Sequence, residues 1–266
     1  MMVMHLLLFD LDGTLLRSDK SISDRTLQSL KKCREQGILI GVSTSRSEKN
    51  SMNYIREVAP DILIVSGGAV VKFGDRYILV SEFSEAETEK MICTIRKFCG
   101  EDCEITVDTL ENHFWNYHVD PRQQLGFAWD GSTYTDYSDF QEKALKICAE
   151  IHDPETARRL SEQLPECDCI KFVDGDWYKF TKKTATKESA ILKICDECDI
   201  LPDQITSFGD DLVDIGMLKL CGTGVATGNA LEEVKLAADV VIAGNDEDGI
   251  AEYLEGKYGV FVRDNI

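Results

Sequence analysis

The chain has 266 residues, of which 43% are hydrophobic, a length that suits one large domain or two smaller ones with real cores. Its formal net charge of −19 argues against nucleic acid or an anionic membrane surface as a partner, so an anionic substrate would need a local cation to gather it. No apolar stretch approaches the length of a membrane span, and the short apolar N-terminal run leads into acid with no basic segment before it, so we expect a cytoplasmic protein.

The first part of the chain alternates apolar runs with amphipathic segments. Their lengths and periods predict strands at 3–9, 38–43 and 62–65, helices near 24–35 and 47–58, and a hairpin over 70–80. Two successive βαβ units imply a parallel sheet with right-handed crossovers. Continuous apolar strands fit a sheet that is covered on both faces.

The pattern is mixed in the middle of the chain and regular again after Thr186. The middle predicts a helix at 84–98, aromatic-rich strands around 113–118 and 127–129, an apolar run at 145–151, a helix capped by Asp153-Pro154 and a strand near 168–173. The last part predicts helices at 187–199, 212–220, 230–237 and 247–256. A strand at 204–208 and the segments GTGVA (222–226) and DVVIA (239–243) lie between them. We therefore predict an α/β fold: a doubly wound parallel (Rossmann-like) sheet core from 1–82 and 183–266, with an inserted α+β cap domain at 83–182.

Polar residues follow three of the apolar strands. Asp10 follows the first strand, Ser43-Thr44-Ser45-Arg46 ends the second, and Asp210 to Asp214 follow the strand near 204–208. Open α/β sheets bind ligands at the carboxyl ends of their strands, so these groups should gather at one edge. The acids that would meet there are Asp10, Asp12, Asp210, Asp211 and Asp214.

So many like charges in one place are destabilising unless a cation joins them. Carboxylates without clustered histidine or cysteine favour a hard ion, and Mg²⁺ commonly takes one or two carboxylates together with waters and a phosphate. The sequence therefore predicts a magnesium site and, with it, a phosphorylated substrate.

The residue types suggest how such a substrate would react. With an ordinary pKa of about 3.9, the Asp10 carboxylate is ionised at neutral pH and can attack phosphorus directly. Asp12 can protonate the leaving oxygen and later deprotonate the attacking water, since neighbouring carboxylates raise its pKa. Lys187 and Mg²⁺ would offset the phosphoryl charge, and the hydroxyls of Thr44 and Ser45 would hydrogen-bond the same oxygens.

Each of these segments also has a purely structural explanation. Asp-Leu-Asp-Gly-Thr can be a tight turn, and the acids after Gly209 can cap the next helix. Ser43 and Thr44 can cap the helix at 47–58, and Lys187 can be one of several solvated lysines. A lysine in the first turn of a helix opposes the macrodipole, however, which favours a position facing an anion.

The ten cysteines are expected to be reduced thiols. A zinc site built from Cys167, Cys169, Cys195 and Cys198 is the alternative, but the spacing suits zinc poorly. We prefer to interpret these four as small hydrophobic residues.

In these motifs the chain resembles the haloacid dehalogenase-like phosphatases, specifically the Cof-like branch. The matching segments are Asp10–Thr14, Ser43–Arg46, Lys187, Gly209–Asp214 and Gly224–Ala230. The resemblance implies that Asp10 is the nucleophile and Asp12 the acid/base. It implies that Mg²⁺ is held by Asp10, the Asp12 backbone carbonyl and Asp210, with Asp211 and Asp214 in support, and that phosphate is held by Leu11, Thr44, Ser45 and Lys187.

The chain departs from the branch's pattern at three positions. Val213 replaces an asparagine that in the family helps to bind phosphate or the metal's waters, and Val cannot hydrogen-bond. Ser45 stands for glycine, and Gly67 stands for the usual asparagine. These departures are expected to reduce or redirect activity. Asp211 could partly compensate for the missing asparagine at position 213.

The resemblance and the placement of the insertion together predict a Mg²⁺-dependent phosphatase acting on a small phosphorylated metabolite, such as a sugar phosphate, through an aspartyl-phosphate. The cap should close over the site, exclude water and select the substrate. Its aromatic and histidine side chains either face the substrate or belong to the core: Trp115, Tyr117, His118 and Trp129.

Other functions fit the same acids. Phosphoryl transfer to a hydroxyl acceptor is one, and a phospho-accepting signalling domain of the receiver type is another. A catalytically weak phospho-ligand-binding protein is a third, prompted by Val213.

Overall fold

A computed structural model of the chain describes residues 4–120, 131–172 and 175–261. The chain divides into two compact units. The core unit comprises Met1–Ser45, Asn53–Leu79 and Lys187–Ile266, and the inserted unit comprises Arg46–Met52 and Val80–Thr186. The insertion thus begins at Val80 instead of residue 83 and ends at Thr186 instead of 182, and a short segment after the second strand groups with it.

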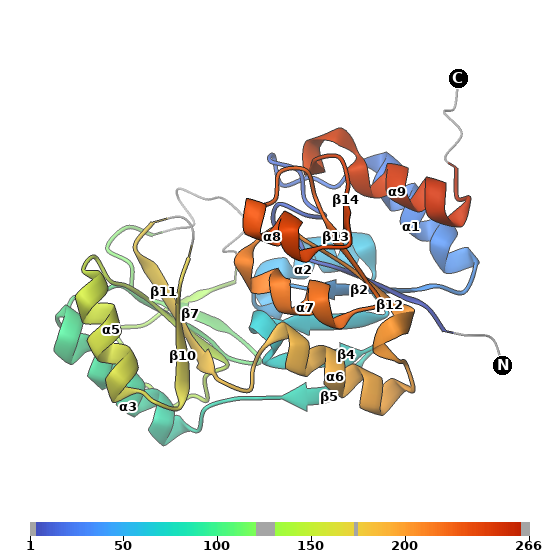
Figure 1. The fold of residues 1–266 in the computed structure, drawn as a ribbon. Helices are drawn as coiled ribbons and strands as arrows, with labels where there is room; N and C mark the ends of the chain where they lie inside the picture. The colour runs from blue at the N-terminus through green and yellow to red at the C-terminus, as the bar shows by residue number, and fades with distance from the viewer. Residues whose placement is uncertain (1–3, 121–130, 173–174, 262–266) are drawn as a thin grey trace. The chain divides into compact units, whose positions relative to one another are not determined.

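The core unit contains an eight-stranded sheet with the strand order β14-β13-β12-β1-β2-β3-β4-β5 (Figure 1). The pairs from β14 to β3 are parallel, whereas β4 is antiparallel to β3. The strands are β1 (Leu6–Phe9), β2 (Leu39–Ser43), β3 (Ile62–Val65), β4 (Val70–Phe73), β5 (Arg76–Val80), β12 (Ile205–Gly209), β13 (Thr223–Ala226) and β14 (Val240–Val241). In the register of the central strand, Phe9 lies beside Val42 of β2 and Phe208 of β12, so these three strands end at the same edge.

Helices cover both faces of this sheet, as the apolar strands predict. They are α1 (Asp24–Glu35), α2 (Glu48–Val58), α6 (Lys187–Cys198), α7 (Ile215–Leu220), α8 (Glu232–Ala237) and α9 (Gly249–Tyr258). Leu8 packs in one cluster with Ile191 of α6 and Met217 of α7. On the opposite face, the ring of Phe208 contacts Tyr253 of α9, and α9 packs beside α1 (Figure 1).

The inserted unit contains a six-stranded sheet with the order β10-β11-β9-β6-β7-β8. Its strands are β6 (Ile105–Asp108), β7 (His113–Trp115), β8 (Thr133–Tyr134), β9 (Lys146–Glu150), β10 (Cys167–Lys171) and β11 (Trp177–Lys182). All pairs are antiparallel except β7 with β8. Helices α3 (Glu85–Cys99) and α5 (Pro154–Gln163) bury their apolar side chains together with alternate residues of the sheet, such as Ile105 and Phe180. The predicted α/β core with an inserted α+β unit is confirmed.

Several details differ from the sequence prediction. β6, β8 and β11 were not predicted, because lysine, aspartate and threonine alternate with their apolar residues, and β7 ends at Trp115 instead of 118. The predicted strand at 127–129, with Trp129, lies outside the described residues. The helix predicted at 212–220 begins as the 3-10 turn η4 (Leu212–Asp214) and continues as α7, because a buried acid at this turn binds the backbone before it.

The helix starts follow the capping rules. The hydroxyl of Ser23 accepts a hydrogen bond from the first turn of α1, Ser84 and Glu87 form a reciprocal capping box on α3, and Asp153 caps α5 with Pro154 in its first position. Within the residues that the structure describes, every helix is too short or too polar to cross a lipid bilayer.

Candidate active site

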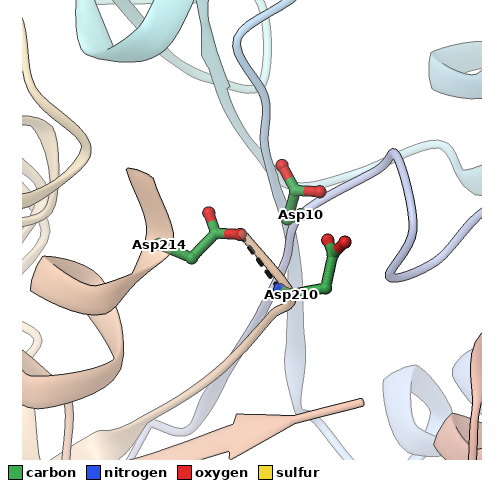
Figure 2. A group of neighbouring side chains, drawn as sticks. All are labelled: Asp10, Asp210 and Asp214. Carbon is green, nitrogen blue, oxygen red and sulfur yellow. Dashed lines mark hydrogen bonds between the residues drawn. The ribbon is translucent and has the colours of Figure 1, made fainter. Parts of the chain in front are cut away.

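Two acidic residues follow neighbouring parallel strands at the same edge of the core sheet. Asp10 comes directly after β1 and Asp210 directly after β12, and the amide of Asp10 donates to the carbonyl of Phe208 at 3.0 Å. Asp214 lies in the turn after β12. Oxygens of these three carboxylates all lie within 4.8 Å of one another (Figure 2). Three of the five acids that the sequence predicted to meet at one edge of the sheet form this cluster, and Asp12 and Asp211 are not among the three.

Lys187 neutralises part of this charge. It is the first residue of α6, and its buried Nζ contacts Asp10 Oδ1 at 2.7 Å, Asp214 Oδ1 at 2.6 Å and the carbonyl of Ser43 at 2.8 Å. Three acceptors match the three protons of the ammonium. Burial by itself lowers the pKa of Lys187, but the adjacent Asp10 and Asp214 raise it above the usual value. The side chain is therefore a fixed positive charge within the acid cluster.

The environment of Asp10 differs from the sequence expectation of an ordinary pKa. Burial raises the pKa of Asp10 well above its usual value, Lys187 opposes this, and the nearby Asp214 and Asp210 add to the increase. The residue is only 7% exposed, which the sequence did not reveal. Because desolvation disfavours the charged form, a further cation beside Asp10 would favour its carboxylate form.

The remaining acids have separate tasks. Asp214 is fully engaged: Oδ1 meets Lys187, and Oδ2 accepts from the amides of Asp210 and Asp211, both at 3.1 Å (Figure 2). Asp210 Oδ1 accepts from the hydroxyl of Thr14 at 2.9 Å. Within the residues that the structure describes, the side-chain hydrogen bonds of Asp10 and Asp210 use Oδ1 of each carboxylate. The second oxygen of each carboxylate is thus available to a cation.

This donor set suits magnesium. The group consists of carboxylates only, and hard divalent ions such as Mg²⁺ prefer oxygen ligands. The residues present therefore fit the metal that the sequence predicted, with Asp214 holding the backbone around Asp210 in place.

Asp12 lies at the apex of the loop after β1. The loop is closed by the amide of Leu15 on the carbonyl of Asp10 (3.2 Å) and the amide of Leu16 on that of Leu11 (2.8 Å). The Asp12 carboxylate accepts from Lys20 Nζ at 2.9 Å. Both side chains of this pair are more than a third exposed, and such pairs contribute only about 0–1 kcal/mol, so the ion pair with Lys20 adds little to stability.

Gly13 allows the loop after β1 to approach Asp210 in the loop after β12. Its φ is +77°, and an added Cβ would lie 2.2 Å from Asp210 Oδ2. No side chain fits there without displacing the carboxylate, which explains the glycine after Asp12.

The predicted phosphate-binding residues lie at the same edge of the sheet. Thr44, which is buried, follows β2 and is held between the carbonyl of Ile64 (2.9 Å) and the amide of Gly67 (3.0 Å). Ser45 is half-buried and Leu11 fully buried. Gly67 has a φ of +72°, a conformation that glycine or asparagine adopts most readily, so its departure from the branch's asparagine preserves the backbone.

Asp211 caps the next helical turn, which is the structural role that the sequence analysis offered for the acids after Gly209. Its Oδ1 accepts from the amide of Leu212 at 2.6 Å, so it caps η4 and is not one of the three clustered acids. The half-buried Val213 lies in the same turn.

Sequence reasoning missed Thr14 and Lys20 as contributors to the site. Thr14 is the last residue of the Asp10–Thr14 motif, and its place in that motif could have identified it. Lys20 reaches Asp12 only because the chain reverses between Arg17 and Ser21, where the amide of Arg17 donates to the carbonyl of Ser21 at 2.9 Å. The sequence pattern does not predict the contact between Lys20 and Asp12.

Mg²⁺ is expected to bind more tightly as the pH rises through about 6. Burial raises the pKa of Asp210 to about 6, so below that pH this carboxylate must release a proton before it can hold a cation, and Asp10 acts in the same direction. Calorimetric Mg²⁺ affinity should fall by about tenfold or more per pH unit below about pH 6. Asp211→Asn, outside the cluster, should keep this dependence. Equal wild-type affinities at about pH 5 and about pH 7 would contradict the assignment.

Comparison with known proteins gives the following relations. A family model described as haloacid dehalogenase-like hydrolase matches residues 7–254. The chain is 27% identical over 264 residues to the 5-amino-6-(5-phospho-D-ribitylamino)uracil phosphatase YitU of Bacillus subtilis (strain 168), covering 94% of this chain and 96% of that protein. It is also 27% identical over 255 residues to a phosphoglycolate phosphatase of Methanopyrus kandleri, covering 94% and 95%. The solved structure of the HAD subclass IIB sugar phosphatase BT4131 is similar with a TM-score of 0.81 and 25% identity, covering 97% of this chain and all of that one (100%).

Proposed function

This chain belongs to the haloacid dehalogenase-like hydrolases, in their Cof-like branch, and is a phosphoric monoester hydrolase; from this we propose that it hydrolyses a small phosphorylated metabolite, with sugar phosphates as the first candidates, through a phosphorylated Asp10. The observation that carries the proposal is the buried Asp10 carboxylate at a strand end, held by Lys187 and accompanied by Asp210. Such a carboxylate is fixed in position for attack and surrounded by the charges that phosphoryl transfer requires.

The reaction proceeds in two displacements. A carboxylate oxygen of Asp10 forms a bond to phosphorus while the bond from phosphorus to the ester oxygen breaks, and Asp12 gives its proton to the departing alkoxide. A water then attacks the same phosphorus, Asp12 takes the proton of that water, and the bond between phosphorus and Asp10 breaks to release phosphate. Asp12 is suited to both steps because it lies at the apex of the loop that carries Asp10.

The transferred phosphoryl group is held by the residues around Asp10. The hydroxyls of Thr44 and Ser45, the backbone of Leu11 and the ammonium of Lys187 supply donors at this edge. The carboxylates of Asp10 and Asp210 and the backbone carbonyl of Asp12 would hold Mg²⁺, which would supply positive charge against the phosphoryl oxygens. Asp214 orients both Lys187 and the backbone of Asp210.

The inserted unit is assigned the role of a cap that selects the leaving group. The similar proteins carry names with different substrates, a ribitylaminouracil phosphate and phosphoglycolate, which supports a shared core reaction with specificity set elsewhere.

Metal removal tests the proposed function. Phosphate release should be measured with p-nitrophenyl phosphate and with a panel of sugar phosphates, phosphoglycolate and 5-amino-6-(5-phospho-D-ribitylamino)uracil. We expect chelation by EDTA to reduce turnover at least about 100-fold, because the phosphoryl charge is then uncompensated, and added Mg²⁺ to restore it. Turnover that is insensitive to EDTA, or absent with every ester, would rule out the proposal. Phosphorylation of an added sugar in place of water would indicate a transferase.

A further inference from the structure

We propose that the turn Thr227–Leu231 sets the separation between the loop that carries Asp10 and Asp12 and the loop that carries Asp210, and that Asn229 is a positioning residue within it. The turn follows β13 and lies outside the acid cluster. The inference rests on the proposed function, because it assigns a role in bringing the nucleophile and the metal-binding acid together.

One side of the turn is bound to the loop of Asp210. The amide of Thr227 donates to the carbonyl of Gly209 at 3.3 Å, and the amide of Leu231 donates to the carbonyl of Asp210 at 3.1 Å. Both bonds join backbone to backbone, so they hold the turn against this loop whatever its side chains are.

The other side of the turn is bound to the loop of Asp10 and Asp12 by side chains. Asn229 Nδ2 donates to the carbonyl of Gly13 at 2.7 Å, and the hydroxyl of Thr227 donates to the same carbonyl at 3.3 Å. Gly13 has no side chain of its own to brace the loop, and its Cα faces Asp210 closely. Its carbonyl is thus the point at which the turn can hold the residue next to Asp12.

The amide of Asn229 is fixed in one orientation. Its Oδ1 accepts from the backbone amide of Asn245 at 3.0 Å, so the NH₂ group must be the part that faces Gly13. Asn245 in turn donates from Nδ2 to the carbonyl of Leu16 at 2.8 Å. Ser18 is tied to the same segment through Asp246, with distances of 2.9 and 2.6 Å. Hydrogen bonds therefore attach the Asp10–Leu16 loop to the segments that follow β13 and β14.

Because Asn229 is exposed, an effect on the position of the loops can be distinguished from an effect on the stability of the fold. Asn229 is exposed, and a single hydrogen bond makes only a small net contribution to stability, so its loss should leave the fold intact. Catalysis is more sensitive, because a misplacement of about 1 Å can reduce a rate by about 100-fold.

Two substitutions at Asn229 test the inference. Asn229→Ala removes the link, and Asn229→Asp keeps its shape but has no N–H to donate. Asn53→Ala, an exposed asparagine of α2 in the same unit, is the matched control. We expect both Asn229 variants to lower kcat about tenfold or more with KM within about twofold of wild type, and to weaken calorimetric Mg²⁺ affinity without substrate several-fold. Their Tm should stay within about 2 °C of wild type, and Asn53→Ala should change none of these values.

The inference is overturned if kcat and Mg²⁺ affinity of Asn229→Ala stay within about twofold of wild type, if Asn229→Asp behaves as wild type, or if the losses are accompanied by a Tm decrease of more than about 5 °C, which would indicate a structural role. If the wild type releases no phosphate from any ester, the proposed function fails, and the Mg²⁺ affinities of the same variants still decide whether Asn229 positions the metal-binding loops.

Discussion

Asp10→Asn is expected to reduce kcat by about 10⁴-fold or more with the fold intact, because the amide has nearly the shape of the carboxylate but cannot form the bond to phosphorus. The residue is buried, and its contact with Lys187 fixes the carboxylate in position. Phosphate release from p-nitrophenyl phosphate at saturating Mg²⁺ measures the loss. Hydroxylamine trapping of an acyl phosphate should succeed with wild type and fail with the variant.

Asp211→Asn provides the matched control for this substitution. Asp211 lies one residue after Asp210, but it caps η4 and is outside the cluster, so we expect its kcat to stay within a few-fold of wild type. If Asp10→Asn kept more than a few per cent of the activity, or if Asp211→Asn were equally inactive, Asp10 would not be the nucleophile.

The stability of Asp10→Asn should also differ from that of the wild type in the absence of Mg²⁺. Burial raises the folded-state pKa of Asp10 above the unfolded value, so ionisation of this group destabilises the folded protein as the pH rises from about 4 through the folded-state pKa. The asparagine variant carries no such charge. Without metal, its stability should therefore fall less than that of the wild type as the pH rises from about 4.

The main part of this site followed from sequence because it depends on strand ends. β1 is a continuous apolar run, β12 is recognisable as a strand, and their parallel pairing places Asp10 and Asp210 at neighbouring strand ends. Lys187 was identifiable because a lysine in the first turn of a helix opposes the macrodipole, and the structure shows it buried between two carboxylates.

Other features depend on details that a strand pattern does not contain. The raised pKa of Asp10 arises from burial, which comes from the surrounding loops and helices, not from its neighbours in sequence. Lys20 meets Asp12 through a chain reversal, and Asn229 meets Gly13 across more than 200 positions. A contact of this kind requires the loop conformations themselves.

The buried charges of the inserted unit also could not be predicted from the sequence pattern. Asp108 of β6 lies opposite Lys146 of β9 and His113 of β7, and β6 was not predicted from the sequence. Asp108 Oδ2 lies 2.7 Å from Lys146 Nζ, and Oδ1 is hydrogen-bonded to His113 Nδ1. Burial raises the pKa of Asp108, but Lys146 and the hydrogen-bonded His113 together hold it below the usual value. Its contribution to stability is thus present above about pH 4 and lost as the pH falls further.

Lys146→Met is therefore expected to lower the free energy of unfolding of the inserted unit by about 3–5 kcal/mol at about pH 7, since it leaves the buried Asp108 carboxylate without its main partner. Urea unfolding measures the change. Lys143→Met is the matched control, because Lys143 forms an exposed pair with Glu82 at the same 2.7 Å and should cost less than about 1 kcal/mol.

The double variant Asp108→Asn/Lys146→Met removes the stranded charge and should recover part of the loss. A cost for Lys146→Met no larger than that for Lys143→Met would show that the buried pair is not a stabilising unit. A double variant no more stable than Lys146→Met would show that the loss comes from packing of the lysine chain and not from the unpaired carboxylate, because an asparagine at position 108 needs no compensating cation.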